Sequence, residues 1–353
     1  MIQAQGYAAQ QAKAPLRQYS FERRDPRNHD VVVDIQYCGI CHTDVHQVND
    51  EWGGSIFPMV PGHEIVGIVT KVGAKVSRYK LGDRVGVGCL VDSCRQCSHC
   101  VNGLEQYCIE GPTMTYNGIE RDGQTRTQGG YSNKIVVDEN YVLRIPDNLP
   151  MDCAAPLLCA GITMYSPLLH WKAGPGKKVG IIGLDGLGHM GVKIAHALGA
   201  EVSVLSHSIR KQDEAKEMGA DKFYAVSTSL PIGHESFEEL QGYFDLILNT
   251  LSVEIDWNRY LNLLALDGTM IVVGLPKKET PLSASPLINA RRSLAGSGIG
   301  GIKETQQMLD FCSKHNISSD IELISIQEVN EAYPRVVNSD VRYRFVVDTK
   351  SLG

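Results

Sequence analysis

The sequence predicts a two-domain α/β protein in which a β-rich domain is split around a second domain with a doubly wound parallel sheet. Length is the first indication, because 353 residues exceed the ~250–300 at which a single hydrophobic core stops growing. The second is a change of pattern near residue 177, where short β-branched runs give way to a strand, a glycine-rich turn and a helix. The third is a β-like segment near the C-terminus that resembles the first third of the chain.

The first domain is predicted from short strands separated by turn residues. Residues 31–35 and 65–69 are β-branched runs, and the tripeptide Leu81-Gly82-Asp83 is a turn signal. Residues 343–347 alternate between apolar and polar side chains, so we expect this segment to return to the first domain as a strand.

The second domain is predicted from a βαβ unit. Residues 178–183 form a short apolar strand, residues 189–198 have helical spacing, and residues 201–205 form the next strand. Three later segments are candidates for further parallel strands, namely residues 244–248, 268–273 and 294–297.

Composition argues against nucleic acid and membrane as the main partners. The chain has 34 Lys and Arg against 40 Asp and Glu, a net charge of −6, and contains no basic run. No apolar run approaches the ~18–20 residues of a spanning helix. The N-terminus lacks the pattern of a signal peptide, so we expect a cytoplasmic protein.

The strongest motif is a cysteine cluster with the spacing Cys94-x2-Cys97-x2-Cys100-x7-Cys108. Clustered cysteines in a reducing compartment are more often metal ligands than disulfides. Four thiolates can close a tetrahedral shell around Zn²⁺ and leave no open position, so this site is expected to stabilise a lobe. An iron–sulfur site would need fewer residues between the third and fourth cysteines, and a Pro after the fourth. Free or disulfide-bonded cysteines remain an alternative.

A second group of residues with metal-binding chemistry is dispersed along the chain. It consists of the segment Cys41-His42-Thr43-Asp44-Val45-His46, the segment Gly62-His63-Glu64, and Cys159. Taken alone, Cys41 could be a buried thiol and His63 a histidine of the core.

The motifs together resemble those of the zinc-containing medium-chain alcohol dehydrogenases, in the cinnamyl-alcohol-dehydrogenase-like branch that includes bacterial NADPH-dependent aldehyde reductases. The resemblance covers essentially the whole chain. It rests on Gly62-His63-Glu64-x2-Gly67-x5-Gly73-x2-Val76, on Cys41-His42-Thr43-Asp44, on Pro156-Leu157-Leu158-Cys159-Ala160-Gly161-Ile162-Thr163, and on Gly300-Gly301-Ile302-Lys303-Glu304-Thr305. It implies a GroES-like catalytic domain of residues 1–159 and 298–353 around a Rossmann cofactor domain of residues 160–297.

The resemblance also implies a second, catalytic zinc. Cys41, His63 and Cys159 match its three protein ligands, and the fourth position stays open, as in the alcohol dehydrogenase ligand set. Glu64 matches an acid that lies behind the metal and can join its shell. Asp44 matches the partner that orients His63. The alternative for Asp44 and Glu64 is that both are solvated loop charges.

Thr43 and His46 resemble the proton relay of the family. Aldehyde reduction needs a hydride on carbon and a proton on oxygen, and a hydroxyl linked to a histidine can supply that proton. His42 matches a position that contacts the cofactor pyrophosphate. An ordinary surface histidine is the alternative for His46.

The cofactor turn departs from the pattern of the relatives. Their turn reads Gly-x-Gly-Gly-x-Gly, and here it reads Gly183-Leu184-Asp185-Gly186-Leu187-Gly188. We expect the backbone of Gly183, Gly186, Leu187 and Gly188 to approach the pyrophosphate. A carboxylate at Asp185 would either repel the phosphates or point to solvent.

The end of the second predicted strand favours NADP(H) over NAD(H). An acidic residue there would bind a ribose 2′-hydroxyl, but this chain has Ser206, Ser208, Arg210 and Lys211, which suit a 2′-phosphate. The alternative is a helix N-cap at Ser208 with solvated cations. By resemblance, Thr163, Thr250, Gly274 and Ile299 line the cofactor cleft.

Trp52 and Ile299 resemble apolar walls of a pocket for an aromatic or long aliphatic aldehyde. Gly298 stands where relatives have a bulky apolar residue, and Trp52 could instead belong to the core.

The resulting prediction is a zinc enzyme with two zincs per chain that reversibly reduces aldehydes to primary alcohols with NADPH. Its partners would be the small-molecule aldehyde or alcohol and further copies of the chain, as a dimer or tetramer. A polyol dehydrogenase and a catalytically silent NADP-binding sensor are the alternatives.

Overall fold

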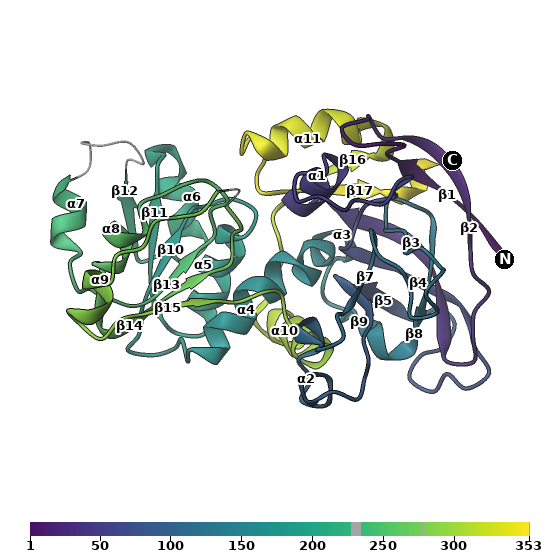
Figure 1. Cartoon of the computed structure of the whole chain (residues 1–353), viewed down its shortest axis with the longest axis horizontal. Coiled ribbons are helices and arrows are strands. Elements are labelled where there is room, and N and C mark those ends of the chain that lie inside the picture. Colours follow the sequence, from purple (N-terminus) through teal and green to yellow (C-terminus); the bar gives the residue numbers. More distant parts are fainter. Residues whose placement is uncertain (227–233, 277, 353) are drawn as a thin grey trace. The chain divides into compact units, whose positions relative to one another are not determined.

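The computed structural model describes residues 1–226, 234–276 and 278–352 (Figure 1). The chain divides into two compact units. The first unit comprises Met1–Ile162 and Gly300–Gly353, and the second comprises Thr163–Ile299. The chain therefore leaves the first unit once and returns to it near the C-terminus.

The first unit is built on a seven-stranded sheet with the order β16-β17-β3-β4-β5-β9, in which β8 also pairs with β3. Its strands are β3 Asp30–Gly39, β4 Ile65–Val72, β5 Arg84–Val87, β8 Lys134–Asp138, β9 Leu143–Arg144, β16 Ile321–Ser325 and β17 Arg344–Asp348. The predicted strands at 31–35 and 65–69 lie within β3 and β4. The C-terminal strand β17 pairs antiparallel with β3, so its predicted return to the first domain is confirmed.

The burial of this strand is continuous although its side chains are of mixed polarity, since Arg344 through Val347 are all buried. The reason is that β17 lies inside the sheet between β16 and β3, and the polar side chain of Arg344 has a buried acidic partner.

Smaller elements surround this sheet. They are β1 Ile2–Ala8, β2 Arg17–Arg23, α1 His42–Val48, β6 Leu90–Asp92, α2 Ser98–Val101, η1 Glu105–Tyr107, β7 Thr113–Met114, η2 Glu139–Tyr141, α3 Met151–Ala154, η3 Ala155–Leu158, α10 Ile302–His315, η5 Ile326–Glu328, α11 Val329–Val337 and η6 Thr349–Leu352. Helix α4, Ala160–His170, begins in the first unit and continues into the second.

The second unit contains a six-stranded parallel sheet with the order β12-β11-β10-β13-β14-β15. The strands are β10 Lys178–Ile182, β11 Glu201–Ser206, β12 Lys222–Ala225, β13 Phe244–Asn249, β14 Leu264–Val272 and β15 Ser293–Gly296. The helices are α5 Gly188–Ala197, η4 Ile209–Lys211, α6 Gln212–Glu217, α7 His234–Glu239, α8 Trp257–Leu261 and α9 Ser285–Ile288. Strand order reverses between β10 and β13, the place where such sheets bind nucleotides.

The apolar runs account for this second sheet. Four of the five residues of β10 are buried, and Leu205, Phe244, Ile247 and Met270 belong to one buried apolar cluster. Such continuous burial is typical of parallel strands covered on both faces. The predicted strands at 178–183, 201–205, 244–248, 268–273 and 294–297 are confirmed within a residue or so, apart from the start of β14 at Leu264. Strand β12 was not predicted.

No single helix in the described residues is long and apolar enough to cross a membrane. Two consecutive helical segments, Met151–Leu158 and Ala160–His170, reach that length and composition only when they are taken together, and the chain bends between them. Most of its side chains are buried within the protein, as in the core helices of a folded domain.

Candidate active site

The four clustered cysteines converge in the first unit. The sulfur atoms of Cys94, Cys97, Cys100 and Cys108 all lie within 4.8 Å of one another, and none forms a disulfide. Cys100 Sγ lies 3.8 Å from Cys94 Sγ and 3.5 Å from Cys97 Sγ. Ligands ~2.3 Å from a tetrahedral zinc would be about 3.8 Å apart, so this donor set fits the metal.

Backbone groups around the cluster favour thiolates. The amides of Cys97 and Cys94 donate to Cys94 Sγ and Cys108 Sγ at 3.3 and 3.4 Å. Amides of Ile109 and Cys100 lower the pKa of Cys97 to about 6. The four residues therefore suit a closed, structural zinc site.

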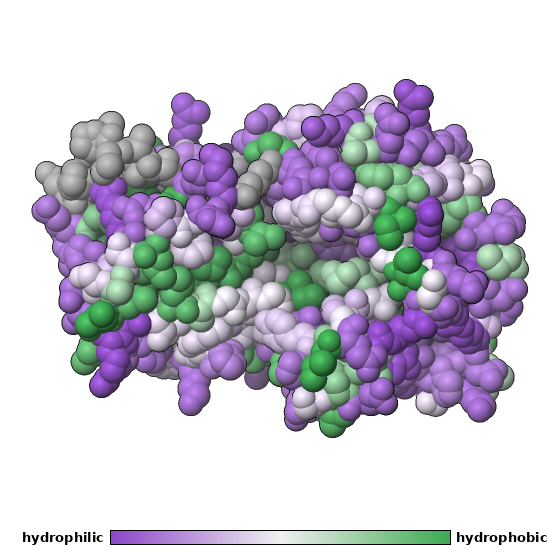
Figure 2. Space-filling model, viewed as in Figure 1, coloured by the Kyte–Doolittle hydropathy of each residue, from purple (hydrophilic) through white to green (hydrophobic). Residues whose placement is uncertain are grey.

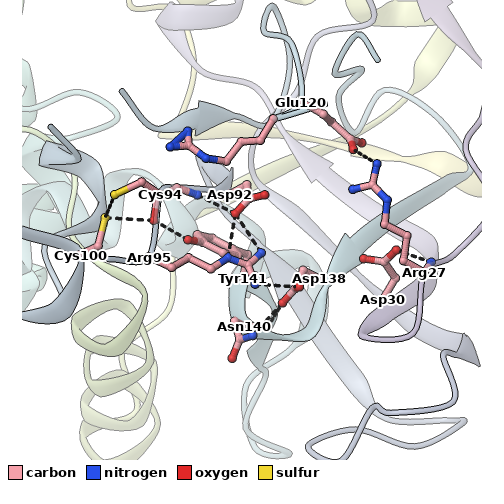
Figure 3. A network of polar contacts seen from close by, with 12 residues as sticks. Arg27, Asp30, Asp92, Cys94, Arg95, Cys100, Glu120, Asp138, Asn140 and Tyr141 are labelled. Carbon is pink, nitrogen blue, oxygen red and sulfur yellow. Dashed lines mark hydrogen bonds and ion pairs between the residues drawn. The ribbon is translucent and has the colours of Figure 1, made fainter. Parts of the chain in front are cut away.

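A polar network supports this lobe from the side (Figure 3). Ser93 Oγ lies 3.1 Å from Cys100 Sγ and 2.6 Å from the hydroxyl of Tyr141. Arg95 bridges Asp92 and Asp138 at 2.9 Å each. The network thus ties the cysteine loop to strand β8 and to η2.

The second set of predicted ligands also converges, from three separate parts of the first unit. Cys41, His63, Glu64 and Cys159 each place one donor atom within 4.8 Å of the other three. Cys41 precedes α1, His63 and Glu64 precede β4, and Cys159 follows η3. Cys41 Sγ lies 3.9 Å from Cys159 Sγ. Two thiols and an imidazole in this arrangement can hold zinc and leave a position open.

The electrostatics of the donor set favour an anionic Cys41, whereas the neighbouring Cys41 and Cys89 raise the pKa of Cys159. Cys159 and His63 hold the pKa of Cys41 well below its usual range despite burial. Burial disfavours a charged His63, but Cys89 and Asp44 outweigh it and raise the pKa of His63 well above its ordinary value. Cys89 was not singled out from the sequence, because its proximity to Cys159 arises only in the fold.

Asp44 is fully buried, so the alternative of a solvated loop charge is wrong for it. One carboxylate oxygen lies 3.3 Å from Nδ1 of His63 and accepts the amide of Gly62 at 3.1 Å. The other accepts the amide of Cys41 at 2.9 Å and the hydroxyl of Tyr131 at 3.2 Å. This contact occupies Nδ1 of His63 and leaves Nε2 for a metal.

Glu64 is also fully buried and is not a solvated loop charge. One of its oxygens is paired with the guanidinium of Arg344, while Oε2 has no hydrogen-bond partner among the described residues. Burial raises the pKa of Glu64 to about 7, although Arg344 opposes the shift. An unpartnered carboxylate oxygen beside two thiols and an imidazole fits a cation at this place.

The predicted relay residues lie on or next to α1. His46 Nδ1 lies 2.5 Å from Glu51 Oε2, and only 12% of the His46 side chain is exposed, unlike an ordinary surface histidine. Its ring is 6.2 Å from that of His42 and 4.8 Å from that of Trp52. Trp52 itself is 41% exposed, so the alternative that it belongs to the core is wrong. Thr43 is half-buried on the same helix.

The predicted cofactor residues of the second unit follow the carboxyl ends of its strands. Gly183 directly follows β10 with φ +91°, and a Cβ there would lie 2.8 Å from Thr250 Oγ1. A Cβ at Gly188 would lie 2.1 Å from the carbonyl oxygen of Gly183, so both positions require glycine. Gly274 follows β14, where a Cβ would lie 2.3 Å from the oxygen of Leu251.

The remaining cofactor and substrate candidates belong to the same unit. Ser206 is buried at the end of β11, and Thr163 is buried on α4. Ile299 has φ +38°, which is rare for a β-branched residue. A Cβ at the neighbouring Gly298 would meet nothing within 4 Å, in line with the expected space at this position.

Asp185 does not point freely into solvent. Its carboxylate lies 2.5 Å from the ammonium of Lys211, which also donates to the carbonyl oxygen of Leu184 at 2.8 Å. Lys211 is only 6% exposed, so the alternative that it is a solvated cation is wrong. Ser208 occupies the N-cap position of η4, as in that alternative, but its side chain makes no capping hydrogen bond.

Comparisons with known proteins find relatives over the whole chain. The alcohol dehydrogenase GroES-like domain matches residues 27–147, and the zinc-binding dehydrogenase domain matches residues 186–314. NADP-dependent alcohol dehydrogenase C 1 of Mycolicibacterium smegmatis is 57% identical and covers 100% of this chain and 99% of its own length. Aldehyde reductase YahK of Escherichia coli is 49% identical, with 98% and 97% covered. The crystal structure of CAD from Helicobacter pylori complexed with NADP(H) has a TM-score of 0.92 and 42% identity, over 99% of both chains.

Proposed function

Because this chain belongs to the zinc-binding alcohol dehydrogenase family, we propose that it reversibly reduces aldehydes to primary alcohols with NADPH. It is an enzyme of the cinnamyl-alcohol-dehydrogenase-like type that uses zinc and NADP(H). The proposal rests above all on one observation. Two thiols, an imidazole and a carboxylate from distant parts of the chain meet in one buried donor set.

In this proposal Cys41, His63 and Cys159 hold the catalytic zinc, and Glu64 stands behind it. When bound, zinc polarises the substrate carbonyl and NADPH supplies the hydride. Asp44 accepts a hydrogen bond from His63 and thereby keeps the imidazole in the tautomer that a metal needs. The chain's remaining task is to deliver a proton to the substrate oxygen.

Thr43 and His46 carry out that proton transfer. The Thr43 hydroxyl would supply a proton to the substrate oxygen, and His46 on the same helix would link this relay to solvent. Glu51, at 2.5 Å from His46 Nδ1, keeps the imidazole oriented. His42, Gly183, Gly186, Leu187 and Gly188 bind the cofactor pyrophosphate, and Thr163, Thr250, Gly274 and Ile299 line its cleft.

The adenosine end of the cofactor is bound at the end of β11. Ser206 and Ser208 offer hydroxyls for a 2′-phosphate, and no acidic residue takes the place that NAD-dependent enzymes reserve for the 2′-hydroxyl. Substrates are aromatic or long aliphatic aldehydes, with Trp52 and Ile299 as apolar walls. The open space at Gly298 supports a broad range of substrates.

The two compact units support a division of labour. The unit with both donor sets, Met1–Ile162 and Gly300–Gly353, serves as the catalytic domain, and the unit with the parallel sheet, Thr163–Ile299, serves as the cofactor domain. The bounds expected from the sequence, 1–159 with 298–353 and 160–297, differ from these by two or three residues. The cysteines Cys94, Cys97, Cys100 and Cys108 hold the second, structural zinc.

We further propose a cytoplasmic homo-oligomer, a dimer or tetramer. Strand β15 is an edge of its sheet, and edge strands pair readily with other chains. Leu282 and Ile288 lie just before β15 and are exposed by 46% and 75%. Figure 2 shows hydrophobic residues gathered among hydrophilic ones on this unit. Ten free cysteines suit a reducing compartment.

The first test measures NADPH oxidation with benzaldehyde or cinnamaldehyde, together with zinc content. We expect turnover and two zincs per chain in the native protein. Cys159→Ala should lose turnover and one zinc but still bind NADPH, whereas Cys153→Ala, a cysteine outside both donor sets, should behave as the native protein.

Native turnover and two zincs in Cys159→Ala would overturn the ligand assignment. Oxidation of mannitol with NADP⁺ in preference to primary alcohols would instead favour the polyol dehydrogenase. Tight NADPH binding without turnover on any aldehyde, in protein with two zincs, would favour the silent sensor.

A further inference from the structure

The glycine-rich turn of residues 183–188, here called the glycine turn, contains an ion pair that neither the motif nor the family pattern predicts. Asp185 occupies the second glycine position of the turn, and Lys211 is the cation predicted to bind a 2′-phosphate. The structure brings these two residues together, with Nζ of Lys211 at 2.5 Å from Oδ1 of Asp185. The two residues that looked like separate features of the sequence form one feature of the fold.

The burial of the pair indicates that it is a defined contact. The side chain of Lys211 is 7% exposed and that of Asp185 is 30% exposed. The ammonium also donates to the carbonyl oxygen of Leu184 at 2.8 Å, so two of its bonds go to successive residues of the turn. Removal of one partner from such a pair leaves a poorly solvated charge, which is costly.

The position of the carboxylate gives the pair a function. Asp185 comes three residues before α5, where the pyrophosphate of a dinucleotide is expected to meet backbone amides. An unpaired carboxylate at this place would repel the phosphates. Lys211 neutralises that charge. Because its ammonium binds Asp185 and Leu184, it is not available to a phosphate group at the end of β11.

We propose that Asp185 holds Lys211 at the glycine turn, where the ammonium neutralises the carboxylate instead of binding the 2′-phosphate. The 2′-phosphate is then recognised by Ser206, Ser208 and Arg210. Arg210 precedes Lys211 in the same 3-10 helix and is exposed, whereas Lys211 is buried. A guanidinium and two hydroxyls in one short segment of the chain suit a phosphate group. This inference rests on the proposed NADP(H)-dependent function and identifies Asp185 as a residue that tunes coenzyme specificity.

A double-mutant cycle on Asp185 and Lys211 tests the proposal through binding alone. Dissociation constants for NADPH and NADH are measured on the full chain by calorimetry, with 2′,5′-ADP and 5′-AMP as probes of the adenosine end. The variants are Asp185→Gly, Lys211→Met, the double variant, Arg210→Ala, and Lys216→Ala as a control that removes an exposed cation nearby. Lys211→Gln and thermal unfolding guard against misfolding.

We expect Lys211→Met to weaken NADPH and NADH by a similar factor, because the unpaired Asp185 faces the pyrophosphate that both share. Asp185→Gly should release Lys211 and raise the preference for NADPH about tenfold, the value of one additional charged contact. Lys211→Met should then abolish that gain in the Asp185→Gly background. Arg210→Ala should weaken NADPH and 2′,5′-ADP selectively, and Lys216→Ala should change neither.

Selective weakening of NADPH by Lys211→Met in the otherwise native chain, with NADH unchanged, would overturn the proposal, because Lys211 would then bind the 2′-phosphate. An unchanged coenzyme preference in Asp185→Gly would overturn it too. A native chain that binds neither coenzyme would refute the proposed function itself, and this result is distinct from both others.

Discussion

Asp44 shows how much of the candidate active site depends on one side chain. Its two oxygens contact His63, the amides of Cys41 and Gly62, and the hydroxyl of Tyr131. A buried carboxylate is stable only if such donors compensate for lost water. The same contacts fix the orientation of the imidazole and of the loop that carries Cys41.

Asp44→Asn should weaken binding of the catalytic zinc by about 10- to 100-fold, the usual effect of losing a partner behind a metal ligand. Competition with a chelator would measure this affinity, and the zinc of the four-cysteine site should be retained. Asp213→Asn, which changes an exposed acid on α6, serves as the control. Equal zinc affinities in both variants would show that Asp44 does not support His63.

Short spacings were sufficient to predict the four-cysteine set, whereas the second donor set was predicted only from the resemblance to a family, because Cys41, His63 and Cys159 lie far apart in the chain. The partners of these ligands could not be predicted in the same way. Arg344 contacts Glu64 across 280 residues, and Tyr131 contacts Asp44 across 87 residues. For the contact between Arg344 and Glu64, the only hint in the sequence was a single arginine in the otherwise apolar C-terminal strand. The ion pair of Asp185 with Lys211 could not be predicted either, because it forms only when the fold brings the turn after β10 close to η4.

At the scale of elements, the cysteine lobe is too weak to order itself. Helix α2 has 4 residues and η1 has 3, whereas isolated helices shorter than ~12–15 residues are marginal in water. The loop between β6 and β7 buries few apolar side chains, and Val101, Leu104 and Ile109 are exposed. Its order must come from the sulfur ligands and from the network around Arg95.

Cys100→Ser should therefore remove the structural zinc and the order of the lobe together. We expect loss of amide exchange protection over residues 93–111 and a drop from two zincs to one, since structural zinc supplies folding free energy directly. Cys153→Ser, outside both donor sets, should retain both zincs and full protection. Persistent protection after loss of the metal would mean that the polar network suffices.

Helices and strands could be predicted where the pattern of apolar residues along the chain was clear. The four inner strands of the second unit, β10, β11, β13 and β14, are largely apolar runs, and they were located from the sequence alone. Strand β12 was missed because none of its 4 residues is fully buried and it lies at the edge of the sheet, where no apolar pattern is needed. The start of β14 was placed late, because Asp267 and Gly268 interrupt the apolar pattern.

At the scale of the whole molecule, buried carboxylates make stability depend on pH. Glu139 is buried and accepts the amides of Ser77 and Arg78 at 3.0 and 2.9 Å. Burial alone would raise its pKa, but these hydrogen bonds and His29 outweigh it and lower the pKa below the ordinary 4.5. A carboxyl group with a depressed pKa in the fold stabilises the protein above its unfolded pKa, and this contribution is lost as pH falls through the folded value.

Glu139→Gln should therefore reduce the free energy of unfolding at pH 7 by about 1.5–3 kcal/mol, the typical worth of hydrogen bonds to a charged group. The deficit should shrink as pH falls below 4.5, where Glu139 in the unfolded chain is already protonated. Urea unfolding of both proteins across this pH range is the measurement. A deficit that does not vary with pH would show that the charge of Glu139 contributes nothing.

The pairing of β17 with β3 has a consequence for biosynthesis. The ribosome finishes the whole second unit before it makes Arg344, because residues 163–299 precede β17 in the chain. The parallel sheet can thus fold while the first unit still lacks an internal strand and the cation that compensates Glu64. Until that strand arrives, the end of β3 at residues 37–39 lacks its partner strand, and such an unpaired edge can join another chain.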